Sequence, residues 1–176
     1  SPRVQYQYRP SWSVPTRINF SMGFYHQHPQ YREFRNREGM INKGVTAQKS
    51  LQFITGIDRF LTLWGRPFIF TTQAYYKYLW DLNPYEIDNV RIRYYADNIA
   101  KGYASGLDIR INGEFIAGTQ SWVSLGLLKT MEDIENDENG YQRRPSDQRI
   151  TIGAFFEDHL PNDPSLRVYL NLNFGS

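Results

Sequence analysis

Cysteine is absent from the 176-residue chain, which excludes disulfide frameworks, thiolate metal sites and cysteine nucleophiles. Net charge is also nearly absent: 20 Lys and Arg residues against 18 Asp and Glu give a formal charge of +2. That balance gives no support to a nucleic-acid partner. No apolar run approaches the roughly 18 residues that a membrane-spanning helix needs. The mean hydropathy of −0.60 is typical of a soluble protein, but it does not exclude a membrane β-barrel, whose strands alternate apolar and polar residues.

Helical periodicity is nearly absent, and alternation with a period of two takes its place. In the clearest case, Leu166, Val168, Leu170, Leu172 and Phe174 alternate with Arg, Tyr and Asn residues. Successive side chains of a strand point to opposite faces. Similar segments lie near residues 4–9, 17–24, 51–58, 68–78, 106–111, 123–127 and 149–157. The pattern predicts an all-β chain of about eight antiparallel strands, each roughly 8–12 residues long, near the length of a tilted membrane strand.

The expected connections alternate between short and long. Residues 10–15, 64–67, 112–113 and 160–164 read as short turns, and Asn112-Gly113 is a strong hairpin dipeptide. The segments 26–46, 80–101 and 132–146 are long and polar. Short turns on one side and long loops on the other are typical of outer-membrane barrels. A soluble β-sandwich also alternates. The continuous apolar face and the aromatic residues near the strand ends favour a transmembrane barrel instead.

An ordered set of short segments carries a resemblance to a known family. These segments are residues 1–12, 23–33, 47–50, 64–67, 86–95, 102–106, 144–149 and 160–164. Together, in this order, they resemble the C-terminal barrel region of TonB-dependent outer-membrane receptors, in the form common among Bacteroidetes. The resemblance covers nearly the whole chain. It implies that residues 1–176 are a partial β-barrel domain, one section of a larger barrel of about 22 strands, with the plug and the TonB box elsewhere.

The resemblance also implies a function in the cell outer membrane. Such receptors actively import scarce, bulky nutrients such as metal chelates, cobalamin or glycans. The implied partners are outer-membrane lipid and lipopolysaccharide, the remainder of the barrel and plug, the TonB complex, and, for a glycan, a surface lipoprotein. An alternative is a small eight-stranded outer-membrane barrel that acts as an anchor or adhesin. No cofactor is expected.

The alternation also predicts which side chains face the lipid and which face the lumen. The lipid-facing set is Ile18, Phe20, Met22, Leu166, Val168, Leu170 and Leu172. The lumen-facing set is Gln5, Asn19, Gln73, Asp108, Arg110, Arg167 and Asn171. We expect the two terminal strands to be open edges that pair with further chain, because every backbone polar group in lipid needs a partner.

A basic and aromatic cluster in the first long loop is the candidate ligand site: Tyr25, His26, His28, Tyr31, Arg32 and Arg35. Arg and Tyr side chains can grip an anionic or ring-bearing ligand. His26 and His28 alternate, but a metal site needs three or four ligands, and the third histidine, His159, is expected at a short turn on the other side of the membrane. No metal site is therefore predicted. A loop that packs on its neighbours or on lipopolysaccharide is the simpler interpretation.

Three other segments offer no clear chemistry. The acidic run from Glu132 to Glu138 lacks the spacing of a calcium loop. Alternation around residues 90–94 suggests that a strand extends above the membrane, and Asp147 is expected to order its own turn. No catalytic residues are assigned and no enzyme is expected. Ser50, Ser105 and Ser124 could serve as the nucleophile of a barrel hydrolase, but no histidine that could act as the base lies on a predicted barrel face.

Overall fold

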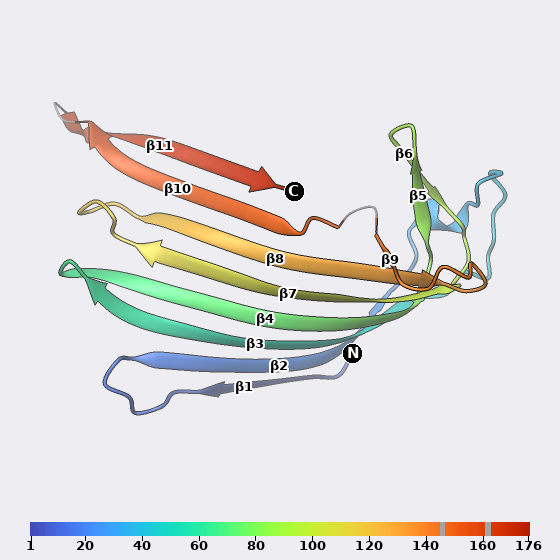
Figure 1. Ribbon diagram of the computed structural model, residues 1–176, viewed down its shortest axis with the longest axis horizontal. Helices are drawn as coiled ribbons and strands as arrows, with labels where there is room; N and C mark the ends of the chain where they lie inside the picture. The colour runs from blue at the N-terminus through green and yellow to red at the C-terminus, as the bar shows by residue number, and fades with distance from the viewer. Residues whose placement is uncertain (145–146, 161–162) are drawn as a thin grey trace.

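The computed structural model describes residues 1–144, 147–160 and 163–176 as an antiparallel, all-β protein (Figure 1). Its long strands are β1 (Arg3–Tyr8), β2 (Thr16–Gln27), β3 (Gln48–Leu63), β4 (Arg66–Leu82), β7 (Ala100–Gly113), β8 (Ser121–Ile134), β10 (Ile150–Leu160) and β11 (Asp163–Gly175). The short elements are the 3-10 helix η1 (Tyr31–Phe34) and strands β5 (Tyr85–Asp88), β6 (Arg91–Tyr94) and β9 (Gln142–Arg143). The expected all-β class is confirmed. No helix in the described ranges is long and apolar enough to cross a membrane.

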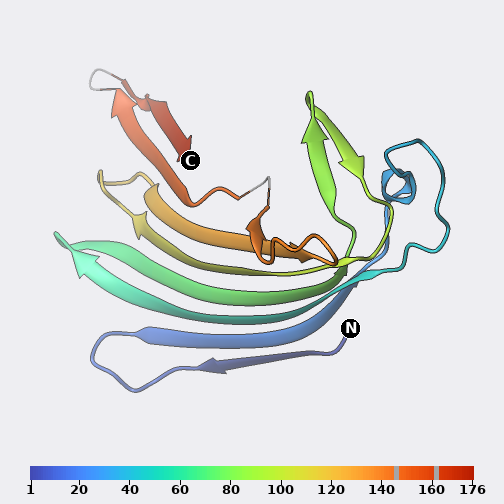
Figure 2. The same cartoon turned by 45° about the vertical axis from the view of Figure 1, so that its right-hand side comes forward.

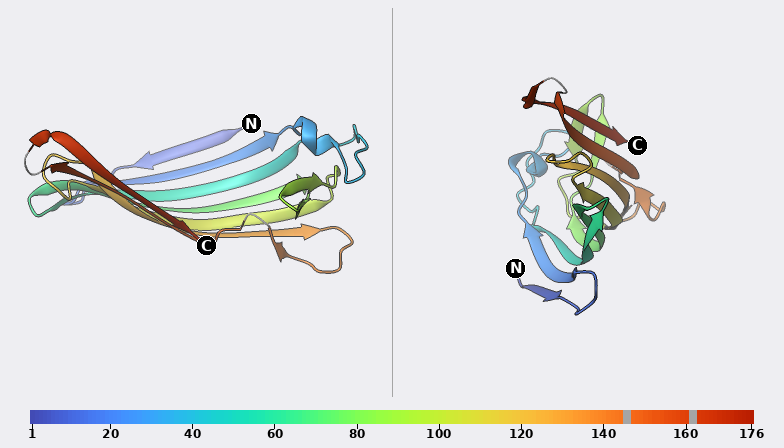
Figure 3. Two further views of the ribbon diagram at one scale, coloured as in Figure 1. Left: turned by 90° about the horizontal axis from the view of Figure 1, so that it is seen from above. Right: turned by 90° about the vertical axis from the view of Figure 1, so that its left-hand side faces the viewer.

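The long strands form one curved sheet in the order β1-β2-β3-β4-β7-β8-β10-β11, and β9 pairs with β8 (Figure 3). Each long strand pairs with the next long strand along the chain, so the sheet is an up-and-down meander. β1 and β11 are its two edges and do not pair with each other. The sheet is therefore an open wall, with backbone hydrogen-bonding groups free along both edges.

The connections separate by length to the two ends of the sheet (Figure 1). At what we call the turn end, β3 and β4 are joined by Trp64 and Gly65, both with positive φ. At the loop end lie the segments 28–47 and 83–99 and the described residues 135–144 and 147–149. The expected alternation of short turns and long loops is confirmed.

Two local predictions are wrong. Asn112 and Gly113 are not a turn: β7 runs through both, and residues 114–120 make the connection to β8. β7 continues because Asn112 pairs with Ile69 and Trp122, and Gly113 with Phe68 and Ser121, on its two neighbouring strands. The segment 85–94 does not extend a strand of the sheet. It forms a separate hairpin, β5–β6, which pairs only with itself and stands over the loop end (Figure 2).

The register divides the sheet into a polar face and an apolar face, because residues directly opposite each other share a face. One row of the polar face crosses all eight strands: Gln7, Asn19, Gly56, Gln73, Asp108, Gly126, Thr151 and Gly175. The adjacent row lies on the apolar face: Tyr8, Ile18, Ile57, Thr72, Ile109, Leu125, Ile152 and Phe174. The predicted separation of the two side-chain sets is therefore present in the structure.

The sheet does not enclose a hydrophobic core. Buried apolar side chains in the described part of the chain are few: Val45, Leu82, Ala96 and Ala100 at the loop end, and Phe68 at the turn end. The accessible surface is 12022 Å², whereas a compact monomer of this mass exposes about 8,900 Å². About a third more surface is open to the surroundings than a self-contained globular domain allows. Most of the apolar face is therefore left uncovered by the rest of this chain.

Aromatic side chains gather at both ends of the apolar face. At the loop end, the Phe24 and Trp80 ring centroids lie 5.3 Å apart, and those of Tyr78 and Trp80 lie 5.6 Å apart. At the turn end, the rings of Trp64, Phe68, Phe115 and Phe156 form a chain with centroid separations of 5.8, 5.1 and 5.8 Å. The apolar rows lie between these two clusters.

Candidate functional site

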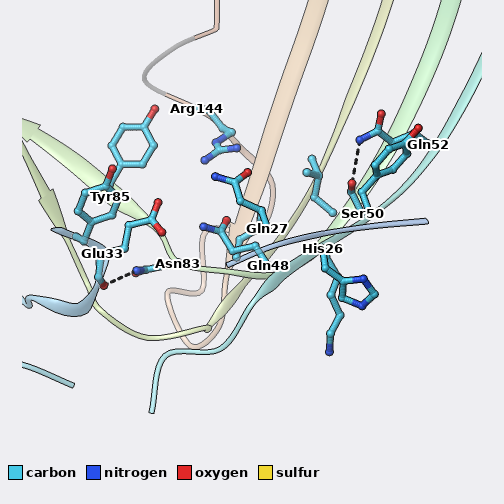
Figure 4. Close-up of a pocket in the computed structure, with 14 residues that line it drawn as sticks. His26, Gln27, Glu33, Gln48, Ser50, Gln52, Asn83, Tyr85 and Arg144 are labelled. Carbon is cyan, nitrogen blue, oxygen red and sulfur yellow. Dashed lines mark hydrogen bonds between the residues drawn. The ribbon is translucent and has the colours of Figure 1, made fainter. Parts of the chain in front are cut away.

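A recess of about 450 Å³ opens on the polar face at the loop end (Figure 4). Its floor is the sheet, where β2 and β3 place Tyr25 opposite Ser50 and Gln27 opposite Gln48. Period-two alternation brings these side chains to one face, so the floor is polar although both strands contain apolar residues. We refer to this hollow as the recess.

Amide and hydroxyl groups dominate the floor of the recess. Gln52 Nε2 donates a hydrogen bond to Ser50 Oγ at 3.0 Å. Among the described residues, the side chains of Gln27 and Gln48 make no hydrogen bond with any other group of the chain. Each amide offers two donors and one acceptor, so these two glutamines can bind hydroxyl, amide or carbonyl groups of a ligand.

The loops supply the upper part of the recess. Glu33 from η1, Tyr85 and Tyr94 from the β5–β6 hairpin, and Arg144 beside β9 all line it. The Tyr85 and Tyr94 rings lie 5.9 Å apart, and the Arg144 guanidinium lies 5.6 Å from the centre of the Tyr85 ring. Figure 4 shows Tyr85, Glu33 and Arg144 facing the glutamines of the floor. Aromatic rings beside amide groups can stack on a ligand and form hydrogen bonds with it at the same time.

Arg144, which lines the recess, forms an ion pair with Glu132 of β8. Arg144 Nε lies 3.2 Å from Glu132 Oε2, with side chains 20% and 7% exposed, but the geometry is not that of a hydrogen bond. Glu132 Oε1 and Arg144 Nε therefore lack a hydrogen-bond partner in the described part of the chain. Burial raises the pKa of Tyr94 above its ordinary value, and the nearby Glu33 carboxylate adds to this effect. Tyr94 is thus a protonated phenol, able to donate a hydrogen bond, throughout the neutral range.

Three asparagines bind the long loops to one another. Asn83 Nδ2 donates to Glu33 O at 2.9 Å, and Asn42 Nδ2 donates to Ala96 O at 2.9 Å. Asn98 Oδ1 accepts from the Thr46 amide at 2.6 Å. Each bond joins the segment 28–47 to the segment 83–99, so the upper part of the recess is held in place before any ligand arrives.

Replacing Asn83 by alanine is expected to loosen these loops. Asn83 is 2% exposed, and its Oδ1 also accepts from the Asp97 amide at 3.3 Å. The substitution leaves the Glu33 carbonyl and the Asp97 amide without partners inside the protein, at a cost of roughly 1–3 kcal/mol. Hydrogen exchange of residues 30–35 and 95–99 should accelerate. Asn139→Ala, in an exposed loop, is the matched control. Equal protection in the two variants would contradict this role of Asn83.

The six residues of the predicted ligand cluster do not meet at one site. Tyr25 and His26 both border the recess. The His26 ring, however, turns away from the floor toward the apolar face (Figure 4), where its centroid lies 4.6 Å from that of Phe24. His28 lies in the loop beyond β2 and, among the described residues, makes no contact with the recess. Tyr31, Arg32 and Arg35 belong to η1 and its C-cap, outside the recess. The single site expected from sequence is not what the structure brings together, because neighbouring strand residues alternate in direction.

The other expected positions are placed as follows. Gln73, Asp108, Arg110, Arg167 and Asn171 all share the polar face, and their exposure to a lumen remains a prediction. His159 lies in β10 opposite Arg167 rather than in a turn, so the expectation that no histidine lies on a sheet face is wrong. In the described ranges, no group of three or more His, Cys, Asp or Glu residues is placed to hold a metal ion.

Two loop interpretations change with the structure. Asp147 orders more than its own turn: its Oδ1 accepts from the Thr130 amide at 2.8 Å and from Thr130 Oγ1 at 2.9 Å, which attaches the loop to β8. Glu132 and Asp133 belong to β8 rather than to an acidic loop. Residues 145–146, within the 144–149 motif, and residues 161–162, within the 160–164 turn, lie outside the described residues.

Comparison with known protein families, curated proteins and solved structures finds no match. What the recess can bind is therefore argued only from the residues that line it. Sequence reasoning missed Gln27, Gln48, Gln52, Glu33 and Arg144. Alternation from Tyr25 could have identified Gln27, but the pairing that sets Gln48 beside it spans a long loop with no local signal.

Proposed function

We propose that this chain is a wall segment of a TonB-dependent outer-membrane receptor that imports a bulky nutrient, with the recess as part of its ligand-binding surface. The observation that carries the proposal is the two-faced, coreless sheet: a continuous apolar face lies between two aromatic clusters, and the opposite face is polar. A barrel wall between lipid and an aqueous lumen requires this division, with aromatic girdles at both interfaces.

The arrangement of the connections supports the same proposal. Long, mutually bonded loops meet at one end and line the recess, while short turns close the other end. Outer-membrane barrels place long loops outside the cell and short turns in the periplasm. A nutrient arriving from outside would meet the recess first, where the amides and tyrosines are displayed.

A small closed barrel acting as an anchor or adhesin is the alternative. It requires β1 to pair with β11, because an eight-stranded barrel has no free edge. These strands lie at opposite edges of the sheet, which favours pairing with further chain.

The test is to isolate the native polypeptide that contains this sequence and cross-link it in cells to the TonB protein. We expect it in the outer-membrane fraction, with an intact mass several times 20.8 kDa and a specific cross-link. Membrane location with a mass near 20.8 kDa and no cross-link would overturn the receptor and support the small barrel. Recovery in the soluble fraction would contradict both proposals.

A further inference from the structure

A second hollow, of about 370 Å³, lies between the loop that follows η1 and strand β6. Its walls carry five arginines from two segments that are far apart in sequence: Arg32, Arg35, Arg37, Arg91 and Arg93. We call it the arginine hollow. All five side chains belong to exposed residues, so their guanidinium groups are accessible from outside.

Only part of this positive charge is neutralised by the chain itself. Arg37 pairs with Glu86 and lies 4.2 Å over the Tyr95 ring, and Arg93 Nε lies 3.1 Å from Asp88 Oδ2. Arg35 Nη2 donates to Tyr31 Oη at 3.1 Å, which satisfies a donor but removes no charge. Within the described ranges, Arg32, Arg35 and Arg91 form no ion pair.

The backbone on both sides of the hollow is ordered by local bonds. Asn36 Oδ1 accepts from the Glu38 amide at 3.1 Å and from the Met40 amide at 2.9 Å, which closes a tight loop after η1. On the other side, β6 is paired along its length with β5. The loop after η1 and strand β6 thus hold positively charged side chains around the arginine hollow. Their mutual repulsion is unfavourable, and a bound anion would relieve it.

We propose that the arginine hollow binds a phosphate group. A guanidinium presents a planar fork of donors that matches a phosphate bidentately. Three guanidinium groups without an ion pair suit a group with several oxygens and more than one negative charge. A soluble phosphate compound and the phosphate headgroup of a surface lipid present the same chemistry. The inference goes beyond the receptor proposal and does not depend on it.

The test measures binding of two probes to the full-length protein: inorganic pyrophosphate by calorimetry, and vesicles of phosphatidylcholine with or without phosphatidic acid by flotation. We expect binding of pyrophosphate, of the phosphatidic acid vesicles or of both, weakened by salt. The double variant Arg32→Gln/Arg91→Gln should lose about 100-fold in affinity, since each lost charge-assisted hydrogen bond costs about tenfold. Binding of vesicles alone would identify lipid as the source, and pyrophosphate binding a soluble compound.

Lys43→Gln is the matched control, because it removes one positive charge from the same exposed loop outside the hollow. Its affinity should stay within about twofold of wild type, because a lone exposed charge contributes little. If the double variant does not fold, Arg91→Lys keeps the charge but loses the fork and should bind about tenfold more weakly. Wild-type protein that binds neither probe would overturn the site. So would an arginine variant that binds as tightly as wild type, or an equal loss in Lys43→Gln.

Discussion

Ile152→Arg is expected to prevent stable insertion of this wall into a bilayer, whereas Thr151→Arg, one residue earlier, should be nearly neutral. Both residues are exposed in β10, but Ile152 lies on the apolar face, between the two aromatic clusters, and Thr151 lies on the polar face. An arginine near the middle of the lipid-facing band of a membrane barrel costs about 2–4 kcal/mol. The same residue on a wet face costs little.

The measurement is urea unfolding of the full-length protein in lipid vesicles, together with its yield in the outer-membrane fraction. Neighbouring positions in one strand make a strict comparison, because strand length, pairing and backbone are shared. Equal stability and yield for Ile152→Arg and wild type would show that the apolar face does not meet lipid. Equal damage from Thr151→Arg would show that the polar face is also covered by apolar material.

The second large effect is expected at Phe68. This side chain is 1% exposed, although it lies on the otherwise open apolar face, because Trp64, Phe115 and Gly113 surround it. A Cβ atom on Gly113 would lie 2.4 Å from Phe68 Cδ1, so glycine is required where β7 passes the ring. Phe68→Ala removes the centre of the turn-end aromatic cluster and should destabilise the protein by about 3–5 kcal/mol.

Phe20→Ala provides the comparison, since Phe20 lies on the same face but is 43% exposed. Its loss should be clearly smaller, because fewer protein contacts disappear and no enclosed cavity forms. The measurement is the unfolding midpoint of each variant and of wild type in the same detergent. If Phe20→Ala costs as much as Phe68→Ala, the turn-end cluster has no special structural role.

Much of the sheet could be predicted from sequence because alternation is a local property. Each residue of a strand points opposite to its neighbours, so Leu170 and Asn171 are assigned to different faces without knowledge of any partner. The same rule, applied strictly, would have separated His26 from Tyr25. Both residues border the recess, but their rings point to opposite faces of the sheet, because adjacent side chains of a strand alternate in direction. The role of either residue in ligand binding stays a prediction.

The turns and loops were less predictable because they depend on partners distant in sequence. Asn112 and Gly113 favour a tight turn locally, yet both are held in β7 by pairing with β4 and β8. The segment 85–94 alternates like a strand of the sheet, but it pairs with itself.

The sequence by itself determined the all-β class, the two faces of the wall and the separation of short turns from long loops, since these follow from period-two patterning and turn composition along the chain. Only the tertiary structure decided which side chains meet. Gln27 lies opposite Gln48, although a long loop separates them in sequence. Arg32 and Arg91 line one hollow, although strands β3, β4 and β5 lie between them in the chain. These contacts depend on the strand register and on hydrogen bonds between loops, such as that from Asn83 to the Glu33 carbonyl. The alternation of residues along the sequence specifies neither the register nor these hydrogen bonds.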